Sequence, residues 1–125
     1  MIAADTSSLI AFLAGEQGDD VRRIDEAMNA DLLALPPPVV SELLSAAANK
    51  SNAEYLLARA PLLPIEHGFW ERAGEARRMI LSKGLKAALA DALIAQCCID
   101  ARVELIVRDR DFRHFERLCG LKLAT

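Results

Sequence analysis

The sequence has few cysteines and no long apolar run, and each shortage excludes a class of protein. Its three cysteines are Cys97, Cys98 and Cys119. An odd count with two adjacent residues argues against a disulfide framework and favours reduced, buried thiols. No Cys-x-x-Cys pair exists, and neither His67 nor His114 has a partner at zinc-ligand spacing. No window approaches the roughly 18 apolar residues that a membrane span needs, so we expect no membrane segment.

Aromatic residues, glycine and proline are also scarce. The chain has four Phe, one Trp and one Tyr, so stacking of bases on aromatic side chains should be minor. Six glycines and five prolines leave no long flexible linker. With 125 residues, of which 53% are hydrophobic, residues 1–125 should form a single domain with a real core. The start, residues 1–5, lacks a basic region and carries an acid where a signal peptide would be apolar, so we expect a cytoplasmic protein.

Short apolar segments alternate with helical patterns along the chain. Strands are expected at residues 2–5, 32–35 and 103–107, with extended segments at 62–65 and 121–123. Helices are expected from Ser7 or Ser8 to near Gly15, at 18–30, after Pro38, at 52–60, 67–82 and 88–101, and from about Asp109 or Arg110. This alternation predicts an α/β fold, a three-layer α/β/α sandwich with a short, mainly parallel central sheet.

Four acidic residues occupy special places in this pattern. Asp5 ends the first strand, Glu42 lies in the first turns of the helix after the second, and Asp109 follows the strand at 103–107. Asp91 stands in a nearly apolar helix start, where a charge is costly unless it is capped, paired or bound to metal. Ligand sites of parallel sheets form outside the carboxyl ends of the strands, so these acids can converge in space.

A cluster of carboxylates indicates a hard metal ion. Several negative charges repel one another until a proton or cation relieves the repulsion, and oxygen-only ligands suit Mg²⁺, with Mn²⁺ possible as well. A carboxylate-bound metal can activate water and stabilise the charge of a phosphodiester under attack. The net charge of −3 argues against binding nucleic acid by bulk attraction, but bound cations would change that balance. The residue types therefore favour phosphoryl chemistry.

Four segments, in order along the chain, resemble PIN domains of the VapC toxin type. They are residues 4–10 (ADTSSLI), 39–44 (VVSELL), 84–95 (GLKAALADALIA) and 105–112 (LIVRDRDF). The resemblance implies a PIN-like fold and a metal-dependent endoribonuclease, the toxin of a toxin–antitoxin pair. It also implies that the protein is often a homodimer and is inhibited by a cognate antitoxin.

By the same resemblance, Asp5, Glu42, Asp91 and Asp109 correspond to the acidic, metal-binding catalytic set of the family. Supporting hydroxyl groups are expected from two residues, Thr6 and Ser8. Asp111 competes with Asp109 for the fourth place, and Asp109 is preferred because it lies nearer the strand end. The family commonly has Thr or Ser where this chain has Val107, which removes one hydroxyl from the surroundings of the site.

Each residue also has a structural reading. The acids can act as helix caps or as partners of helix dipoles. An arginine cluster, Arg108, Arg110, Arg113 and Arg117, is typical of a solvated face, but Arg108, Arg110 and Arg113 are also candidates for contacts with RNA phosphates.

Two other functions remain as alternatives. A non-catalytic interaction module could keep the fold, although the complete acidic set argues against it. A phosphoacceptor receiver domain also places acids at strand ends, but it needs a Lys after a late strand and paired early acids, which this chain lacks. A DNA-directed flap nuclease generally needs helical insertions that 125 residues cannot supply. The preference for RNA over DNA rests on the family resemblance.

The antitoxin is expected to cover apolar surface at residues 9–30 and to send a basic side chain toward the acids.

Overall fold

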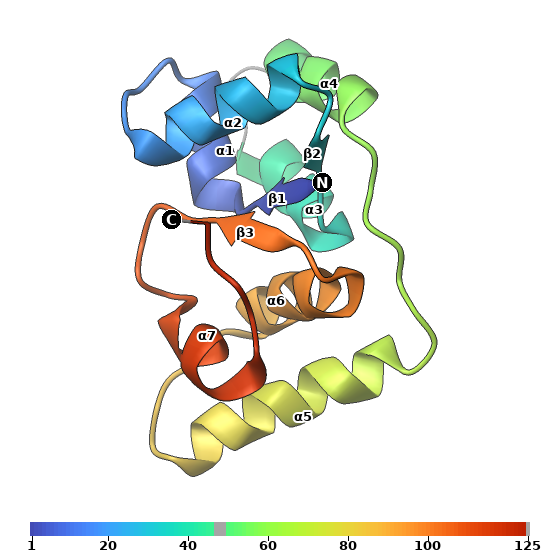
Figure 1. The fold of residues 1–125 in the computed structure, drawn as a ribbon, viewed down its shortest axis with the longest axis vertical. Helices are drawn as coiled ribbons and strands as arrows, with labels where there is room; N and C mark the ends of the chain where they lie inside the picture. Colours follow the sequence, from blue (N-terminus) through green and yellow to red (C-terminus); the bar gives the residue numbers. More distant parts are fainter. Residues whose placement is uncertain (47–49, 125) are drawn as a thin grey trace.

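A short parallel sheet lies at the centre of the molecule. The structure is a computed structural model, and it describes residues 1–46 and 50–124. Its strands are β1 (Ile2–Ala4), β2 (Leu33–Ala34) and β3 (Glu104–Ile106). They stand in the order β2-β1-β3 and run parallel (Figure 1). The first strand is the middle one, and at Asp5 its ladder continues, because the Asp5 N–H donates to the Ile106 carbonyl at 3.0 Å.

Single parallel bridges extend the sheet at both edges. Leu62 pairs with Leu35 beside β2, and Leu123 pairs with Leu105 beside β3. The extended segments expected at 62–65 and 121–123 therefore lie at the sheet edges, but each contributes only one bridge. The expected mainly parallel sheet is confirmed.

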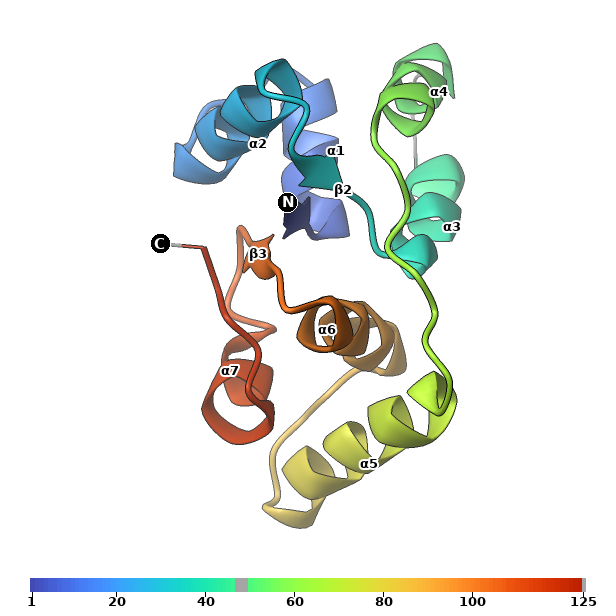
Figure 2. The same ribbon diagram turned by 45° about the vertical axis from the view of Figure 1, so that its right-hand side comes forward.

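Helices cover both faces of this sheet. Within the described residues they are α1 (Thr6–Leu13), α2 (Asp19–Asn29), α3 (Pro37–Ala46), α4 (Lys50–Arg59), α5 (Phe69–Ser82), α6 (Leu89–Ala101) and α7 (Arg113–Cys119). The pair α1 and α2 lies on one side and α6 on the other, with α5 packed against the outer side of α6 (Figures 1 and 2). The three-layer sandwich predicted from the sequence is confirmed, and α5 adds a further helix outside it.

The burial of α6 explains its composition. It packs against β3 on one side and α5 on the other, so apolar residues occur around the whole helix, as expected for a buried helix. Cys97 and Cys98 are residues of this helix and have no exposed surface. All three cysteines of the chain are free thiols, as predicted. No helix in the described ranges is both long enough and apolar enough to cross a membrane.

Two helix starts differ from the sequence-based expectation. The cap of α1 is Asp5 rather than Ser7 or Ser8, and its carboxylate accepts a hydrogen bond from the backbone N–H of Ser8. The last helix begins at Arg113, later than expected, because the carboxylate of Asp109 accepts from the Asp111 N–H and holds this segment in a turn. That turn keeps both acids on a loop directly after β3.

Candidate functional site

Five carboxylates line a single cavity of about 220 Å³ at the carboxyl ends of β1 and β3. We call it the acidic cavity. Its acids are Asp5, Glu42, Asp91, Asp109 and Asp111. The structure thus brings together all four of the acids predicted from the sequence, together with the competing Asp111. They are far apart in the chain and meet because parallel strands end at one edge of the sheet.

Asp5 is the most buried of the five, with 3% of its surface exposed. Its carboxylate accepts hydrogen bonds from the Ser8 N–H at 2.9 Å and from the Ser7 hydroxyl at 3.1 Å. Burial raises the pKa of Asp5 above its usual value, while these hydrogen bonds act in the opposite direction and the charge of Asp109 raises it further. Asp5 therefore serves as a helix cap and faces the cavity at the same time.

Two hydroxyl groups on α1 hold other acids in place. Thr6 Oγ1 donates to Glu42 Oε1 at 2.6 Å and so ties α1 to α3. Ser7 Oγ lies 3.4 Å from Asp109 Oδ2 as well as near Asp5. A hydroxyl has only one hydrogen to donate, so Ser7 serves one of these two carboxylates at a time.

This arrangement only partly matches the expected supporting residues. Thr6 makes a side-chain contact of the expected kind, and Ser8 contributes its backbone N–H. Ser7 was not among the predicted site residues, and the run of three hydroxyl residues after Asp5 was the only signal for it. Val107 is half-buried against the core. The hydroxyl groups nearest these acids therefore come from α1.

Repulsion among the carboxylates is strongest at Asp91, in the first turn of α6. Burial raises its pKa from 3.8 to about 6, and the negative charges of Asp111, Asp109, Glu42 and Asp5 add to this rise. A divalent cation in the cavity would relieve the same repulsion, and carboxylate and hydroxyl oxygens are donors that Mg²⁺ and Mn²⁺ accept. Among the described residues, no three His, Cys, Asp or Glu side chains are close enough together to form a ready-made metal centre. The donor chemistry thus fits such an ion, but a tight ligand shell is not preformed.

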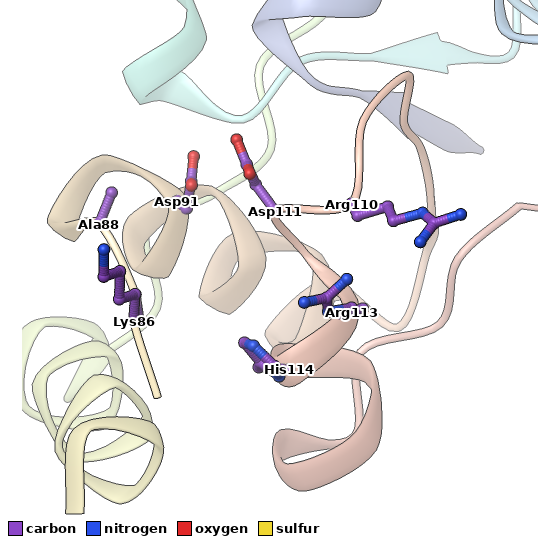
Figure 3. Close-up of a pocket in the computed structure, with 8 residues that line it drawn as sticks. Lys86, Ala88, Asp91, Arg110, Asp111, Arg113 and His114 are labelled. Atoms are coloured by element: carbon purple, nitrogen blue, oxygen red, sulfur yellow. The ribbon is translucent and has the colours of Figure 1, made fainter. Parts of the chain in front are cut away.

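A second cavity adjoins the first. It measures about 400 Å³ and is lined by Asp91 and Asp111, which both cavities share, and by Lys86, Ala87, Ala88, Arg110, Arg113 and His114 (Figure 3). We call it the basic cavity. Arg110 and Arg113 were predicted from the sequence as possible RNA contacts. Lys86 and His114, which come from the loop before α6 and from α7, were not predicted as site residues.

The third predicted arginine, Arg108, lines neither cavity. Its guanidinium donates to Asp20 at 2.8 Å and to the Gln17 carbonyl at 3.0 Å, and it lies 3.7 Å from Glu16. These contacts fasten the segment between α1 and α2 to the end of β3. In this structure Arg108 therefore has a structural role.

Comparison with known proteins agrees with the fold. Similar solved structures include VapBC2 from Rickettsia felis bound to a promoter DNA fragment, with 20% identity and a TM-score of 0.77 over 99% of this chain and 98% of that chain. DNA-bound VapBC from Salmonella typhimurium has 19% identity and a TM-score of 0.74 over 99% and 98%. VapBC-5 from Mycobacterium tuberculosis, a member of a toxin–antitoxin family, has 19% identity and a TM-score of 0.68 over 98% and 95%. At such identities the likeness shows the fold.

No curated protein sequence matches the chain. The family model described as "PIN domain" matches residues 2–118, nearly the whole length. This match covers β1, which precedes Asp5, and every other element that borders the acidic cavity. It sets aside the receiver-domain alternative. The chain belongs to the PIN-domain family.

Proposed function

We propose that this PIN domain is a divalent-metal-dependent endoribonuclease and the toxin of a toxin–antitoxin pair. The observation that carries the proposal is the convergence of five carboxylates on one cavity at the carboxyl edge of the sheet. The raised pKa of Asp91 supports it, because the negative charges of the other four carboxylates add to the effect of burial there. Such a concentration of negative charge serves to bind cations.

The proposed metal ligands are Asp5, Glu42, Asp91 and Asp109, and the ion is Mg²⁺, with Mn²⁺ as the alternative. When bound, the ion would polarise a phosphodiester and its attacking water. The chain's own part is to fix the donors: the Ser8 N–H orients Asp5, and the Thr6 hydroxyl orients Glu42. Hydrogen bonds of this kind restrict the rotamers of ligating carboxylates and tune metal affinity.

Asp111 competes with Asp109 for the fourth ligand position. Both line the acidic cavity, and Asp111 has the larger electrostatic effect on Asp91. Asp109, by contrast, lies near the Ser7 hydroxyl and accepts from the Asp111 N–H. Calorimetric titration of Asp109→Asn and Asp111→Asn with Mn²⁺ separates the two, since loss of a direct ligand lowers the affinity more than loss of a neighbouring charge.

The proposed protein partner is a cognate antitoxin, which rests on the resemblance to VapC-type toxins and on the fold shared with the VapBC structures. A shallow hollow of about 340 Å³ between α1 and α2 supports the expected location at residues 9–30. Phe12 and Val21 supply its apolar part, and Glu16 and Asp25 supply acidic groups at its edge. Ile10, which is 37% exposed, lines the acidic cavity and so offers an apolar path from the same helix toward the acids. We expect the Val21→Asp variant to lose co-purification with the antitoxin. A substitution on α5 should leave co-purification unchanged.

We further propose a cytoplasmic protein that forms a single domain over residues 1–125 and associates as a homodimer. Exposed apolar side chains on α5 and at the start of α6 support self-association: Trp70, Met79, Leu81 and Leu89 are each more than 40% exposed. Sedimentation equilibrium of the purified chain measures the oligomeric state directly. A concentration-independent monomer mass would reject the homodimer.

The decisive experiment is cleavage of a mixed RNA pool by the purified protein in Mg²⁺, Mn²⁺ or EDTA. Asp5→Asn and Asp91→Asn test the acidic cavity, and Glu75→Gln, an exposed acid on α5 that lines none of the cavities described above, is the matched control. We expect cleavage only with metal, with loss in both cavity variants and retention in the control. Folded protein that neither cleaves RNA nor binds metal would favour the non-catalytic interaction module instead.

A further inference from the structure

The basic cavity contains cationic side chains that the protein does not use for its own stability. Arg72 and Arg108 form ion pairs with Asp100 and Asp20. Among the described residues, neither Lys86 nor Arg113 has an ion pair or a side-chain hydrogen bond. Within those same described residues, the Nδ1 atom of His114 is buried and has no hydrogen-bond partner. The cavity therefore has unused capacity to bind an anion.

The placement of this capacity matters because the two cavities adjoin each other. Asp91 and Asp111 belong to both linings, so an extended ligand in the acidic cavity continues directly into the basic one. A polyanion approaching five carboxylates in a protein of net charge −3 is repelled unless fixed positive charge lies beside them. Lys86 and Arg113 supply that charge from opposite sides of the basic cavity (Figure 3).

We propose that the basic cavity holds a backbone phosphate of the RNA strand, the one next to the phosphate that is cleaved, an inference which rests on the proposed ribonuclease function. Lys86 and Arg113 bind the phosphate oxygens, and the imidazole of His114 forms the floor of the cavity. Arg side chains bind phosphates through two parallel N–H donors and Lys through a single ammonium group. These contacts are independent of base identity, so they set the register of the strand over the acids.

Arg117 provides a control from the same helix as Arg113. It lies on α7 but lines neither cavity, whereas Lys86 and Arg113 border the space between α6 and α7 (Figure 3). Arg117 and Arg113 are both exposed and carry the same charge. A general effect of net charge would therefore change RNA binding equally in Arg117→Ala and Arg113→Ala, while a phosphate subsite distinguishes them.

The test is the salt dependence of RNA binding without metal. Fluorescence anisotropy of a short labelled single-stranded RNA is measured in EDTA over a range of KCl concentrations. A plot of the logarithm of the RNA association constant against the logarithm of the salt concentration has a negative slope. Each lost phosphate contact should make this slope less steep by about 0.7. We expect this drop in Lys86→Ala and in Arg113→Ala, about twice the drop in the double variant, and an unchanged slope in Arg117→Ala. Arg113→Lys keeps the charge and should retain most of the slope.

Several outcomes overturn the proposal. Equal drops in Arg117→Ala and Arg113→Ala indicate a diffuse basic surface, and unchanged slopes in all variants, or no binding by the wild type, indicate no subsite. Circular dichroism verifies that each variant is folded. Cleavage assays on the same proteins separate the two proposals: metal-dependent cleavage with unchanged slopes overturns the subsite alone. Slopes that drop as expected in a protein that cleaves no RNA overturn the ribonuclease and leave the subsite standing.

Discussion

The substitution Asp91→Asn should stabilise the metal-free protein at neutral pH while abolishing cleavage. Asp91 lies half-buried among four other carboxylates, and burial together with their charges raises its pKa to about 6. An asparagine has nearly the same shape but no charge to desolvate and no charge to be repelled. The proposed chemistry therefore needs a carboxylate that lowers the stability of the metal-free folded protein.

The sign and size of this effect follow from linkage between protonation and folding. The pKa of an unfolded aspartate is 3.8, so below about pH 3 Asp91 is protonated in both states and costs nothing. As the pH rises from about 3 to about 7 the unfolded state loses its proton first, and the folded state loses relative stability until the penalty is complete above the folded pKa of about 6. At about 1.4 kcal/mol per pH unit the full penalty is about 3 kcal/mol. Because Asp91 is only half-buried, solvent screening reduces it to about 1–2 kcal/mol.

Urea denaturation in EDTA at a series of pH values measures this penalty. The unfolding free energy of Asp91→Asn minus that of the wild type should be near zero at about pH 3 and about 1–2 kcal/mol at about pH 7.5. Glu75→Gln on α5 is the control, and its difference should stay flat. Added Mg²⁺ should stabilise the wild type and have less effect on the variant. Parallel pH profiles for Asp91→Asn and the wild type would refute the reasoning.

Other substitutions test the remaining contacts of the site and the fold. Thr6→Val removes the 2.6 Å bond to Glu42 and should lower Mn²⁺ affinity about tenfold or more in calorimetric titration. Arg108→Ala breaks the contacts with Asp20 and Gln17 and should lower the unfolding free energy by about 1–2 kcal/mol, with RNA anisotropy unchanged; a weakened RNA complex would restore its predicted phosphate contact. Burial raises the pKa of the Cys97 thiol to about 12 and also raises the pKa of Cys98, so Ellman's reagent at pH 8 should leave both unmodified until the protein unfolds.

Hydrophobic periodicity was enough to predict most of the fold. The apolar runs at 2–5, 32–35 and 103–107 correspond to β1, β2 and β3, and the helices between them follow the expected order. The edges were less predictable. The segments at 62–65 and 121–123 have the composition of strands, but each forms one bridge only, because whether an extended segment joins a sheet depends on the neighbour it meets. Local sequence does not contain that information.

The residues of the site could be predicted where their positions follow from the topology, but not where they depend on the direction of a side chain. The expected strand ends and helix starts were enough to predict that the four acids can converge in space. Lys86, Ser7 and His114 were not predicted, because a lysine in a loop and hydroxyl or imidazole groups on helices carry no spacing that marks them. Arg108 and Arg113 have the same residue type in the same segment, yet one is ion-paired with Asp20 and the other lines a cavity. Only tertiary contacts separate them.

The position of the acids also explains how the fold tolerates them. In a parallel sheet with helical connections, a strand's carboxyl end is followed within a few residues by a helix N-terminus, and the partial positive charge there favours an anion. Asp5 caps α1, and Asp91 lies in the first turn of α6. Both acids are therefore in the places where the fold lowers the cost of a buried carboxylate most. The reduction at Asp91 is incomplete, because burial and then the neighbouring carboxylates still raise its pKa, and a bound cation relieves the part that is due to repulsion. The same geometry that gathers the carboxylates thus leaves the folded protein with an unbalanced negative charge at one edge of its sheet.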